Sequence, residues 1–180
     1  FTSKATSSER YISWDSWVED PDAHLGSSGE TVWPRVGNPS LKVVHRASGD
    51  LLDFANEFGG VFSAAGALAS SRVNTSGVLD LQQHAWSTEI YVRSTPDGEA
   101  VRWLGKESDR SSLYAYGWAG ELLIAVATND GAGGLSTLVL RGPGDIAFEL
   151  TGGRPLAISP DGSQLVVTGL DDDLGSNVSV

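Results

Sequence analysis

Oxygen-bearing side chains gather near the end of the sequence in a pattern that could hold a hard metal ion. Asp171, Asp173 and Asn177 lie two and four residues apart, and Gly175 before Asn177 permits a sharp bend. Carboxylate and amide oxygens are ligands that calcium prefers, so these three residues are candidate calcium ligands. The stretch lacks the full spacing of a calcium-binding loop and its distant bidentate Glu. A solvated acidic loop is therefore the favoured alternative.

Tryptophans and acids gather near the beginning of the chain. Trp14, Trp17 and Trp33 are candidate ligand-binding residues, because their rings could stack on sugars. Nearby acids could supply the paired carboxylates of glycoside hydrolysis: Asp15, Glu19, Asp20 and Asp22. Packing of the Trp rings between sheets is the favoured alternative. The connection from 19 to 40 is long and rich in Gly, Ser and Pro, so it is the segment most expected to bind a partner.

Motifs for nucleophilic and zinc chemistry are not found in the sequence. The chain has no Cys, which excludes disulfides, thiolate zinc sites and a Cys nucleophile. His24, His45 and His84 are too scattered for a metal motif, and His45 is expected to pack or to lie on the surface. No Ser occupies the Gly-x-Ser-x-Gly elbow of a hydrolase. No residue is therefore predicted to be catalytic, and no cofactor other than calcium is expected.

The charge balance narrows the range of partners. The 180 residues contain 12 Lys and Arg against 23 Asp and Glu, a formal net charge of -11. This charge opposes binding to nucleic acid, and no apolar run approaches the roughly 20 residues of a membrane span. An acidic, Cys-free chain rich in Ser, Thr and Gly suits a secreted, periplasmic or cell-surface bacterial protein. An extracytoplasmic location without membrane insertion is therefore expected.

Short apolar runs predict that strands, not helices, must position all of these residues. The runs are β-branched or aromatic, and Gly, Pro, Asn or Asp interrupts them every several residues. A helical turn could be drawn over 50–58, but Gly59 and Gly60 follow at once and no capping residue precedes it. The sequence therefore predicts an all-β chain without a helix at 50–58.

A repeat of two hairpins organises the predicted strands. In the first hairpin family the turn glycines Gly49, Gly98 and Gly144 lie about 49 and about 46 residues apart, a spacing typical of stacked four-stranded units. These glycines are expected to supply positive φ, and Pro96 presets the middle turn. The second hairpin family alternates with the first, at 61–73, 113–128 and 156–168. Two hairpins per unit make one antiparallel propeller blade.

The stretch 155–167, which reads Pro-Leu-Ala-Ile-Ser-Pro-Asp-Gly-Ser-Gln-Leu-Val-Val, resembles the WD40-like (TolB-type, PD40) β-propeller repeat of bacterial proteins. In that family a Ser-Pro-Asp-Gly turn joins the innermost strand of a blade to the second strand. Here the role falls on the turn Ser159, Pro160, Asp161 and Gly162. The resemblance covers residues 41–180 and implies a propeller with a protein or peptide partner.

Counting repeats predicts an incomplete propeller. Residues 58–104 and 112–150 each make a whole blade, whereas 1–40 form a partial first blade with a long loop. Residues 41–180 carry the propeller-like repeats, so one domain with two whole and two incomplete blades is expected. Part of a larger propeller is the favoured interpretation. Completion by a second chain, or closure by the two ends of the chain in one composite blade, stays open.

The predicted function is a noncatalytic binding or scaffold module that recognises a protein or peptide through loops on one face. Two alternatives stay open. One is the propeller lid of a prolyl-oligopeptidase-like serine peptidase, and the other is a carbohydrate-binding or glycoside-hydrolase propeller.

Overall fold

The computed structural model contains strands and no helix in the residues that it describes. These residues are 6–19, 36–73, 88–105, 110–129, 134–159, 161–169 and 175–179. They form 15 strands in four antiparallel sheets. Within the stretch 50–58, residues 51–55 form the last strand of one sheet and residue 57 begins the first strand of the next. Asn56 between these two strands has a φ of 64°. The all-β prediction is therefore confirmed.

Each sheet is a meander in which neighbouring strands follow one another in the chain, the pattern of a propeller blade. Blade 1 contains β1 (Thr6–Ser7), β2 (Tyr11–Glu19), β3 (Val36–His45) and β4 (Leu51–Ala55). Blade 2 contains β5 (Glu57–Phe62), β6 (Leu68–Val73), β7 (Thr88–Arg93) and β8 (Val101–Leu104). Blade 3 contains β9 (Arg110–Ala119), β10 (Leu122–Asn129), β11 (Leu135–Gly142) and β12 (Asp145–Thr151). Blade 4 contains β13 (Gly153–Ile158), β14 (Gln164–Gly169) and β15 (Gly175–Ser179).

The blade count agrees with the prediction of two whole and two incomplete blades. Blades 2 and 3 are whole, with four strands each. In blade 1 the innermost strand β1 has only two residues, and blade 4 has three strands in the part of the chain described. The first blade runs across residue 40, which lies inside β3.

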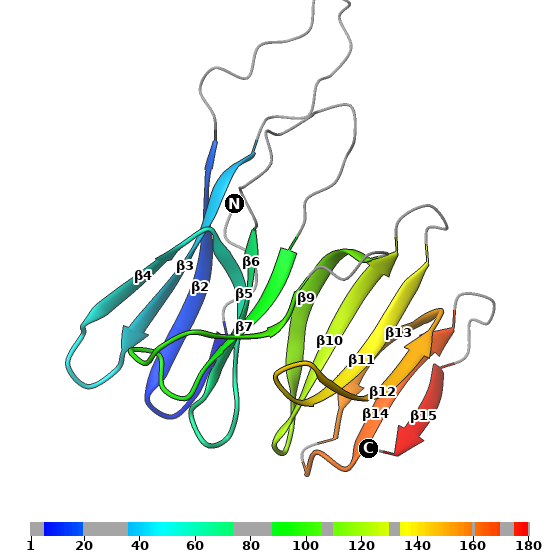
Figure 1. The fold of residues 1–180 in the computed structure, drawn as a ribbon. Helices are drawn as coiled ribbons and strands as arrows, with labels where there is room; N and C mark the ends of the chain where they lie inside the picture. The colour runs from blue at the N-terminus through cyan, green and yellow to red at the C-terminus, as the bar shows by residue number, and fades with distance from the viewer. Residues whose placement is uncertain are drawn as a thin grey trace, which may run out of the picture.

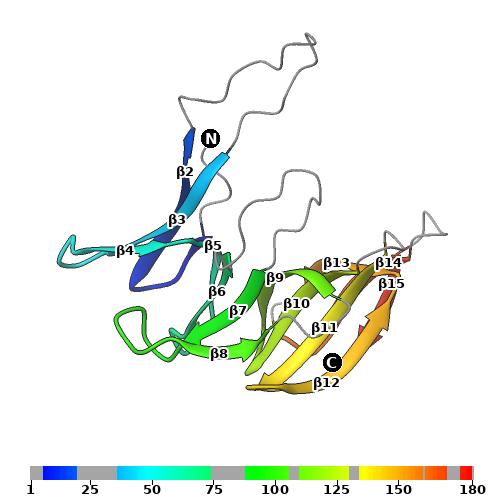
Figure 2. The ribbon, with the colours of Figure 1, turned by 45° about the horizontal axis from the view of Figure 1, so that its top comes forward.

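The four blades stand in a row, each packed on the next in chain order. Blade 1 and blade 4 lie at opposite ends of this row in both views (Figures 1 and 2). The first strands of neighbouring blades contact one another, as β5 does β1 and β9. The structure therefore has the arrangement of consecutive blades in an open propeller.

Glycines set most of the hairpin turns. Gly49 and Gly144 have φ of 77° and 70°, as the sequence predicted for the turns that join the third and fourth strands of a blade. The prediction was wrong for Gly98, whose φ is not positive. There the N–H of Gly98 donates to the Thr95 carbonyl at 2.9 Å, so Gly98 is the fourth residue of a turn with Pro96 second. That fourth position does not require a positive φ.

The core lies in the seams between blades rather than within one sheet. The seam between blades 2 and 3 is the largest and contains Ala69, Ile90, Val92, Leu104, Leu113, Leu123, Ala125, Ala127, Leu138 and Leu140. The seam between blades 3 and 4 contains Ala119, Ile124, Val139, Leu165 and Val167. The seam between blades 1 and 2 has only Leu41, Val43 and Leu68 as buried apolar residues. Polar contacts therefore carry more of the contact between blades 1 and 2.

Candidate functional site

The structure separates Trp14 from Asp15, the two neighbours that the sequence combined in one candidate sugar site. Successive side chains of a strand point to opposite faces. Asp15 is 5% exposed and its Oδ1 accepts a hydrogen bond from the Gly59 N–H of blade 2 at 2.9 Å. Trp14 is half-buried on the other face of β2, in the row of Lys42. Asp15 therefore joins two blades, and it does not share a surface with the Trp14 ring.

The other predicted site residues lie outside what the structure describes. Trp17 is in β2, paired with Pro39, but its side chain is not described, and Trp33 lies in the undescribed range 20–35. Asp171 and Asp173 are also outside the described residues, and Asn177 is described only as a β15 residue paired with Val166. Sugar stacking and calcium binding therefore stay predictions.

In the described ranges, no three His, Cys, Asp or Glu side chains gather closely enough to hold a metal ion. Within the same ranges, no helix has the length and apolar character needed to cross a membrane. His45 has the packing role that the sequence favoured. Its Nδ1 lies 2.9 Å from Ser48 Oγ, and its ring meets the Tyr11 ring edge-on at 5.1 Å.

A buried charge cluster lies between blades 1 and 2, and sequence reasoning missed it. Glu57 at the start of β5 is 1% exposed, and Arg93 on β7 is 5% exposed. The two terminal nitrogens of Arg93 each donate to one Glu57 oxygen at 2.8 Å. Ser70 Oγ donates to the same carboxylate at 2.7 Å, and Arg72 donates to it from two nitrogens, at 2.6 and 3.0 Å. One carboxylate thus holds two guanidinium groups in blade 2.

This cluster keeps Glu57 ionised. Burial raises the pKa of the Glu57 carboxyl, but hydrogen bonds from Arg93, Ser70 and Arg72 outweigh burial, so its pKa lies below the ordinary 4.5. Phe54 of blade 1 covers the Arg93 guanidinium, with 4.1 Å between the guanidinium carbon and the ring centre. A carboxylate saturated in this way is unsuited to act as a base, so the cluster fixes the seam rather than performing chemistry.

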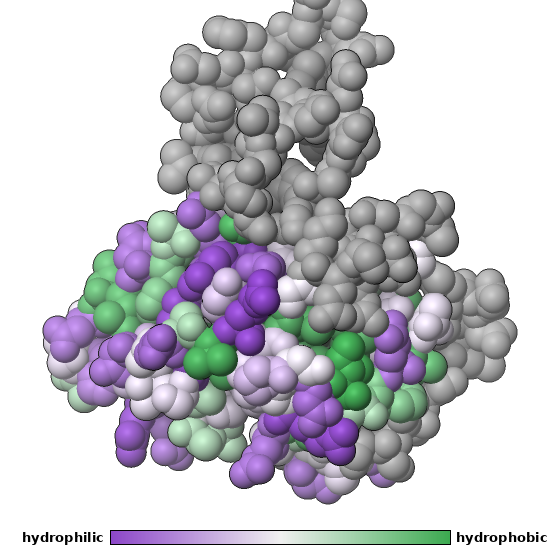
Figure 3. Space-filling view, viewed as in Figure 1, coloured by the Kyte–Doolittle hydropathy of each residue, from purple (hydrophilic) through white to green (hydrophobic). Residues whose placement is uncertain are grey.

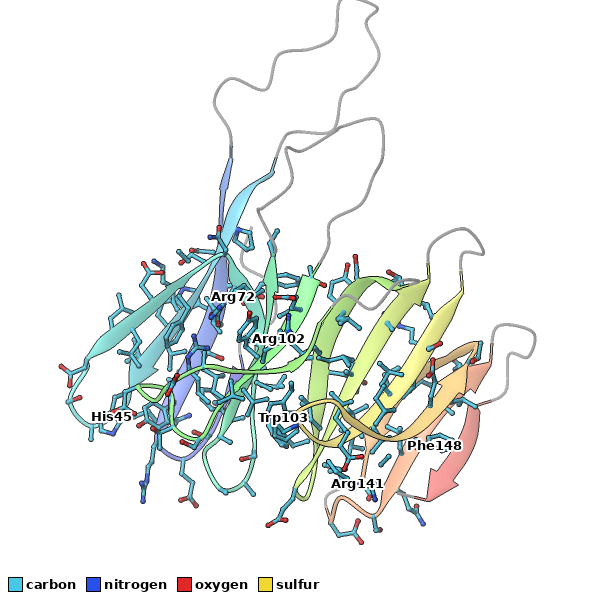
Figure 4. All side chains as sticks on the ribbon, viewed as in Figure 1. His45, Arg72, Arg102, Trp103, Arg141 and Phe148 are labelled. Carbon is cyan, nitrogen blue, oxygen red and sulfur yellow. The ribbon has the colours of Figure 1, made fainter. Side chains whose placement is uncertain are left out.

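The charge cluster continues outward along the same face of blade 2. The Arg72 guanidinium lies over the Tyr91 ring at 3.7 Å, and Tyr91 donates a hydrogen bond to Glu89 at 3.1 Å. Arg102 on β8 pairs with the same Glu89 carboxylate at 3.2 Å and is 61% exposed. Burial, followed by the Glu89 hydrogen bond, raises the pKa of Tyr91. Figure 4 labels Arg72 and Arg102 on this part of the molecule.

A signal for the cluster was present in the sequence. On one side of β6 and β7 every second residue after Leu68 is polar or charged: Ser70 and Arg72, then Glu89, Tyr91 and Arg93. Register places these residues on one face, because Ser70 pairs with Tyr91 and Arg72 with Glu89. The alternation indicates a polar face, but the carboxylate that neutralises Arg93 comes from another strand. Periodicity alone could not supply Glu57.

Two other tryptophans, Trp103 and Trp118, lie in a seam between blades. The rings of Trp103 and Trp118 meet edge-on at 5.7 Å between blades 2 and 3, where Figure 4 labels Trp103. The indole N–H of Trp118 donates to the Val61 carbonyl at 3.2 Å. These two partly buried rings are therefore part of the packing between blades 2 and 3.

The connections between strands differ between the upper and the lower end of the blades. In each blade the end of the second strand and the start of the third lie at the upper end of the blade in Figure 1; these strand ends flank 20–35, 74–87, 130–134 and 170–174. At the opposite end the hairpins close in tight turns at Gly49, Gly66, Gly98, Gly120, Gly144 and Gly162. The strand ends that flank the two longest connections, 20–35 and 74–87, therefore lie at the same end of the blades.

Comparison with solved structures supports the class of fold. The chain is similar to the β-propeller domain of the Trilobed protease from Pyrococcus furiosus, described as having an open Velcro topology, with a TM-score of 0.61 and 12% identity. It is also similar to an acylaminoacyl peptidase in complex with Z-Gly-Gly-Phe-chloromethyl ketone (TM-score 0.61, 12% identity) and to the Pyrococcus horikoshii acylaminoacyl peptidase (0.61, 11%). The protein is thus of the β-propeller class.

These similarities support the fold only, because they cover part of each solved chain. Each similarity covers 93% of this chain, but 47% of the Trilobed protease propeller and 27% of each acylaminoacyl peptidase. The chain therefore spans about half of that propeller domain. No family model and no curated protein sequence matches the chain. The propeller fold is confirmed, while membership of the TolB-type family stays a hypothesis.

Proposed function

We propose that residues 1–180 are a noncatalytic recognition segment of a β-propeller and bind a peptide or protein at the upper end of the blades. The observation that carries this proposal is the common direction of the four blades. It brings the strand ends that flank the two longest connections, 20–35 and 74–87, to one end of the molecule (Figure 1). Binding residues are often found on loops that a rigid scaffold positions. The resemblance of 155–167 to the TolB-type repeat also favours a protein or peptide partner.

The hydrogen bonds of the buried charged residues suit a recognition scaffold better than a catalytic site. Glu57 and Arg93 are buried and saturated by each other, and Asp15 is bonded to the neighbouring blade. The charged groups therefore stabilise the scaffold on which the connections stand.

A second candidate is the propeller part of a peptidase, and the comparisons favour it. All three solved structures reported above belong to peptidases, although identities of 11 to 12% carry the fold alone. In this candidate the chain recognises or admits peptides for a catalytic domain. A hydrolase segment with a Gly-x-Ser-x-Gly elbow in the same gene would support it. A full gene without any hydrolase segment would contradict it.

Peptide binding can be tested through the six Trp residues of the chain. We expect Z-Gly-Gly-Phe to change Trp fluorescence saturably, and a mixture of common mono- and disaccharides to leave it unchanged. A response to the sugars alone, lost in Trp14→Ala or Trp17→Ala, would support the glycoside alternative. No response to the peptide at millimolar concentration would contradict the proposal for this peptide class. Hydrolysis of an acyl-amino-acid p-nitroanilide by the chain alone would contradict the noncatalytic role.

A further inference from the structure

Blade 2 carries a group of four polar side chains on the face that points toward blade 1. Arg72 lies on β6, Glu89 and Tyr91 on β7, and Arg102 on β8. The register pairs Arg72 with Glu89 and Tyr91 with Arg102, which places all four on one face. We call these four residues the arginine surface of blade 2. Arg72 and Glu89 are next to the strand ends that flank the connection 74–87, so this surface begins at the upper end of the blade.

The arginine surface lies inside the row of blades rather than at either end of it. Blades 1 and 2 have four strands each, and blade 2 is packed against blade 1 on one side and blade 3 on the other. On the same face as the arginine surface, Leu68 at the start of β6 packs on Leu41 and Val43 of blade 1. In Figure 3 hydrophilic surface lies between the hydrophobic patches of the described residues. The exposure of Arg72 and Arg102 therefore does not depend on what packs against the outer faces of blades 1 and 4.

Contacts within blade 2 position these side chains. The Arg72 guanidinium lies over the Tyr91 ring, 3.7 Å from its centre, and donates to Glu57 from two nitrogens. The Tyr91 hydroxyl and Arg102 Nη1 both donate to the Glu89 carboxylate, at 3.1 and 3.2 Å. Burial, followed by Glu89, raises the pKa of Tyr91. The positive charges of Arg72 and Arg102 act on this pKa in the opposite direction, so both guanidinium groups lie near the Tyr91 hydroxyl.

Both arginines retain hydrogen-bond donors for a further acceptor. A guanidinium group has five N–H donors. Among the described residues, Arg102 uses one nitrogen, Nη1, for Glu89, and its side chain is 61% exposed. Arg72 uses Nε and Nη2 for Glu57, and its side chain is 33% exposed. An anion that reaches this surface therefore meets guanidinium groups that are positioned but not saturated.

The local charge fits one negative group. When the buried pair is counted together with the arginine surface, three arginines face two glutamates, which leaves one positive charge: Arg72, Arg93 and Arg102 against Glu57 and Glu89. The chain as a whole has a formal net charge of -11, which opposes binding of a polyanion such as nucleic acid. A carboxylate carries one negative charge and matches the planar fork of a guanidinium. A single carboxylate is therefore the group that this surface suits best.

We propose that the arginine surface of blade 2 binds a carboxylate of the peptide partner, with Arg102 and Arg72 donating to its oxygens. The carboxylate is either the C-terminus of the peptide or an acidic side chain, since both present the same group. This inference rests on the proposed recognition of peptides at the upper end of the blades, and it adds the chemical class of the peptide. The surface borders the strand ends that flank 74–87, so a peptide held at the upper end can reach it.

Calorimetric titration of the chain with three peptides tests for the carboxylate site. Z-Gly-Gly-Phe has a free C-terminal carboxylate, its C-terminal amide has none, and the C-terminal amide of Z-Gly-Glu-Phe has one on the side chain only. We expect at least one of the two carboxylate peptides to bind about tenfold more tightly than the uncharged amide, because it gains charge-assisted hydrogen bonds. Tighter binding of Z-Gly-Gly-Phe assigns the site to a C-terminus, and tighter binding of the Z-Gly-Glu-Phe amide assigns it to an acidic side chain.

Variants of matched exposure test the role of the arginines. Arg102→Gln should lower the affinity for the carboxylate peptide about tenfold and leave the affinity for the uncharged amide unchanged. Arg141→Gln is the matched control and should bind all three peptides like the wild type. Arg141 is 60% exposed and pairs with one acid at 3.0 Å, as Arg102 does at 3.2 Å. Glu89→Gln should increase the affinity for the carboxylate peptide, because it frees Arg102 and removes a competing negative charge.

These titrations separate the carboxylate site from peptide binding in general. Equal affinity for all three peptides would overturn the carboxylate site and leave peptide recognition in place. Equal losses in Arg102→Gln and Arg141→Gln would also overturn it, because a general effect of charge would then explain the binding. Circular dichroism of each variant should match that of the wild type, so that a loss of affinity reports on the arginine surface. No binding of any of the three peptides would contradict peptide recognition itself, and with it this site.

Discussion

The guanidinium of Arg93 and the carboxylate of Glu57 form a two-pronged ion pair, with both nitrogen to oxygen distances at 2.8 Å. Both residues are at most 5% exposed. They come from β7 and β5 of the same blade, and Phe54 of the preceding blade covers the guanidinium. The seam between blades 1 and 2, which has the fewest buried apolar residues of the three seams, thus also contains a buried ion pair.

Glu57→Gln should destabilise the fold strongly, because it leaves Arg93 buried without a counter-charge. We expect the free energy of unfolding to fall by about 3 to 5 kcal/mol. Asp145→Asn is the control, since it removes the partner of Arg141 in a pair that is 60% and 50% exposed, and it should cost less than about 1 kcal/mol. Urea unfolding measures both. Equal losses in the two variants would contradict a special role for the Glu57 cluster.

The contribution of Glu57 to stability should depend on pH. Its pKa is lowered from 4.5 by the fold, so the folded state binds a proton less readily than the unfolded chain. The stabilisation is therefore fully present above the unfolded pKa and is lost as the pH falls through the lower folded pKa. The difference in unfolding free energy between wild type and Glu57→Gln should be flat from about pH 7 to about pH 5.5 and shrink below about pH 4.5. A difference that stays constant down to pH 3 would show that Glu57 does not titrate in this way.

Two glycines with nearly the same backbone angle should respond differently to alanine. Gly49 and Gly162 have φ of 77° and 72°, so each Ala variant should lose about 1 to 2 kcal/mol of stability from the left-handed backbone. A Cβ on Gly49 meets nothing within 4 Å, whereas one on Gly162 would lie 2.5 Å from the Gly120 nitrogen of blade 3. Gly162→Ala should therefore cost a further 1 to 3 kcal/mol, roughly the penalty of overpacking. Equal midpoints in urea would contradict the close approach of blades 3 and 4 at this turn.

The sequence predicted the hairpins well because the turns are encoded locally. Gly49, Gly144 and Gly162 stand in tight turns where an L side chain is strained, so their spacing shows the repeat directly. The partner of a side chain across a seam is not encoded locally. Arg46, Arg93 and Arg141 occupy the same place in the hairpin repeat, yet only Arg93 is buried. Its burial depends on Glu57, which lies far away in the sequence and close in space.

The candidate sugar site also depended on contacts between blades, which the local sequence does not encode. Trp14 and Asp15 are neighbours in the sequence, and their types suggested one site. The strand places them on opposite faces, and only the packing of blade 2 decides which face is buried. The structure does not describe Trp33, Asp171 or Asp173, so the predictions for these three residues are not tested.

Two acids of blade 1 should differ in their effect on stability because they lie on opposite faces. Asp15→Ala removes the acceptor of the Gly59 N–H in the seam and should lower the free energy of unfolding by about 1 to 3 kcal/mol. Asp53→Ala removes the partner of Lys42 on the face of blade 1 that points away from blade 2, where the Asp53 side chain is 51% exposed, and should cost less than about 1 kcal/mol. Thermal unfolding of both variants checks the order. A larger loss for Asp53→Ala would contradict the orientation of β2 and β4.

The most direct test of the open row of blades is a set of methyl nuclear Overhauser contacts, measured on the chain with labelled Ile, Leu and Val. Contacts should join Leu68 to the methyls of Leu41 or Val43, and further contacts should cross the seam between blades 2 and 3 and that between blades 3 and 4. Val44 points away from blade 2 and Val166 points away from blade 3, so no contact within the chain should join these two residues. Contacts across all three seams without a contact between Val44 and Val166 would confirm the row of blades. A contact between Val44 and Val166 within one chain would show a small self-closed fold and contradict the account.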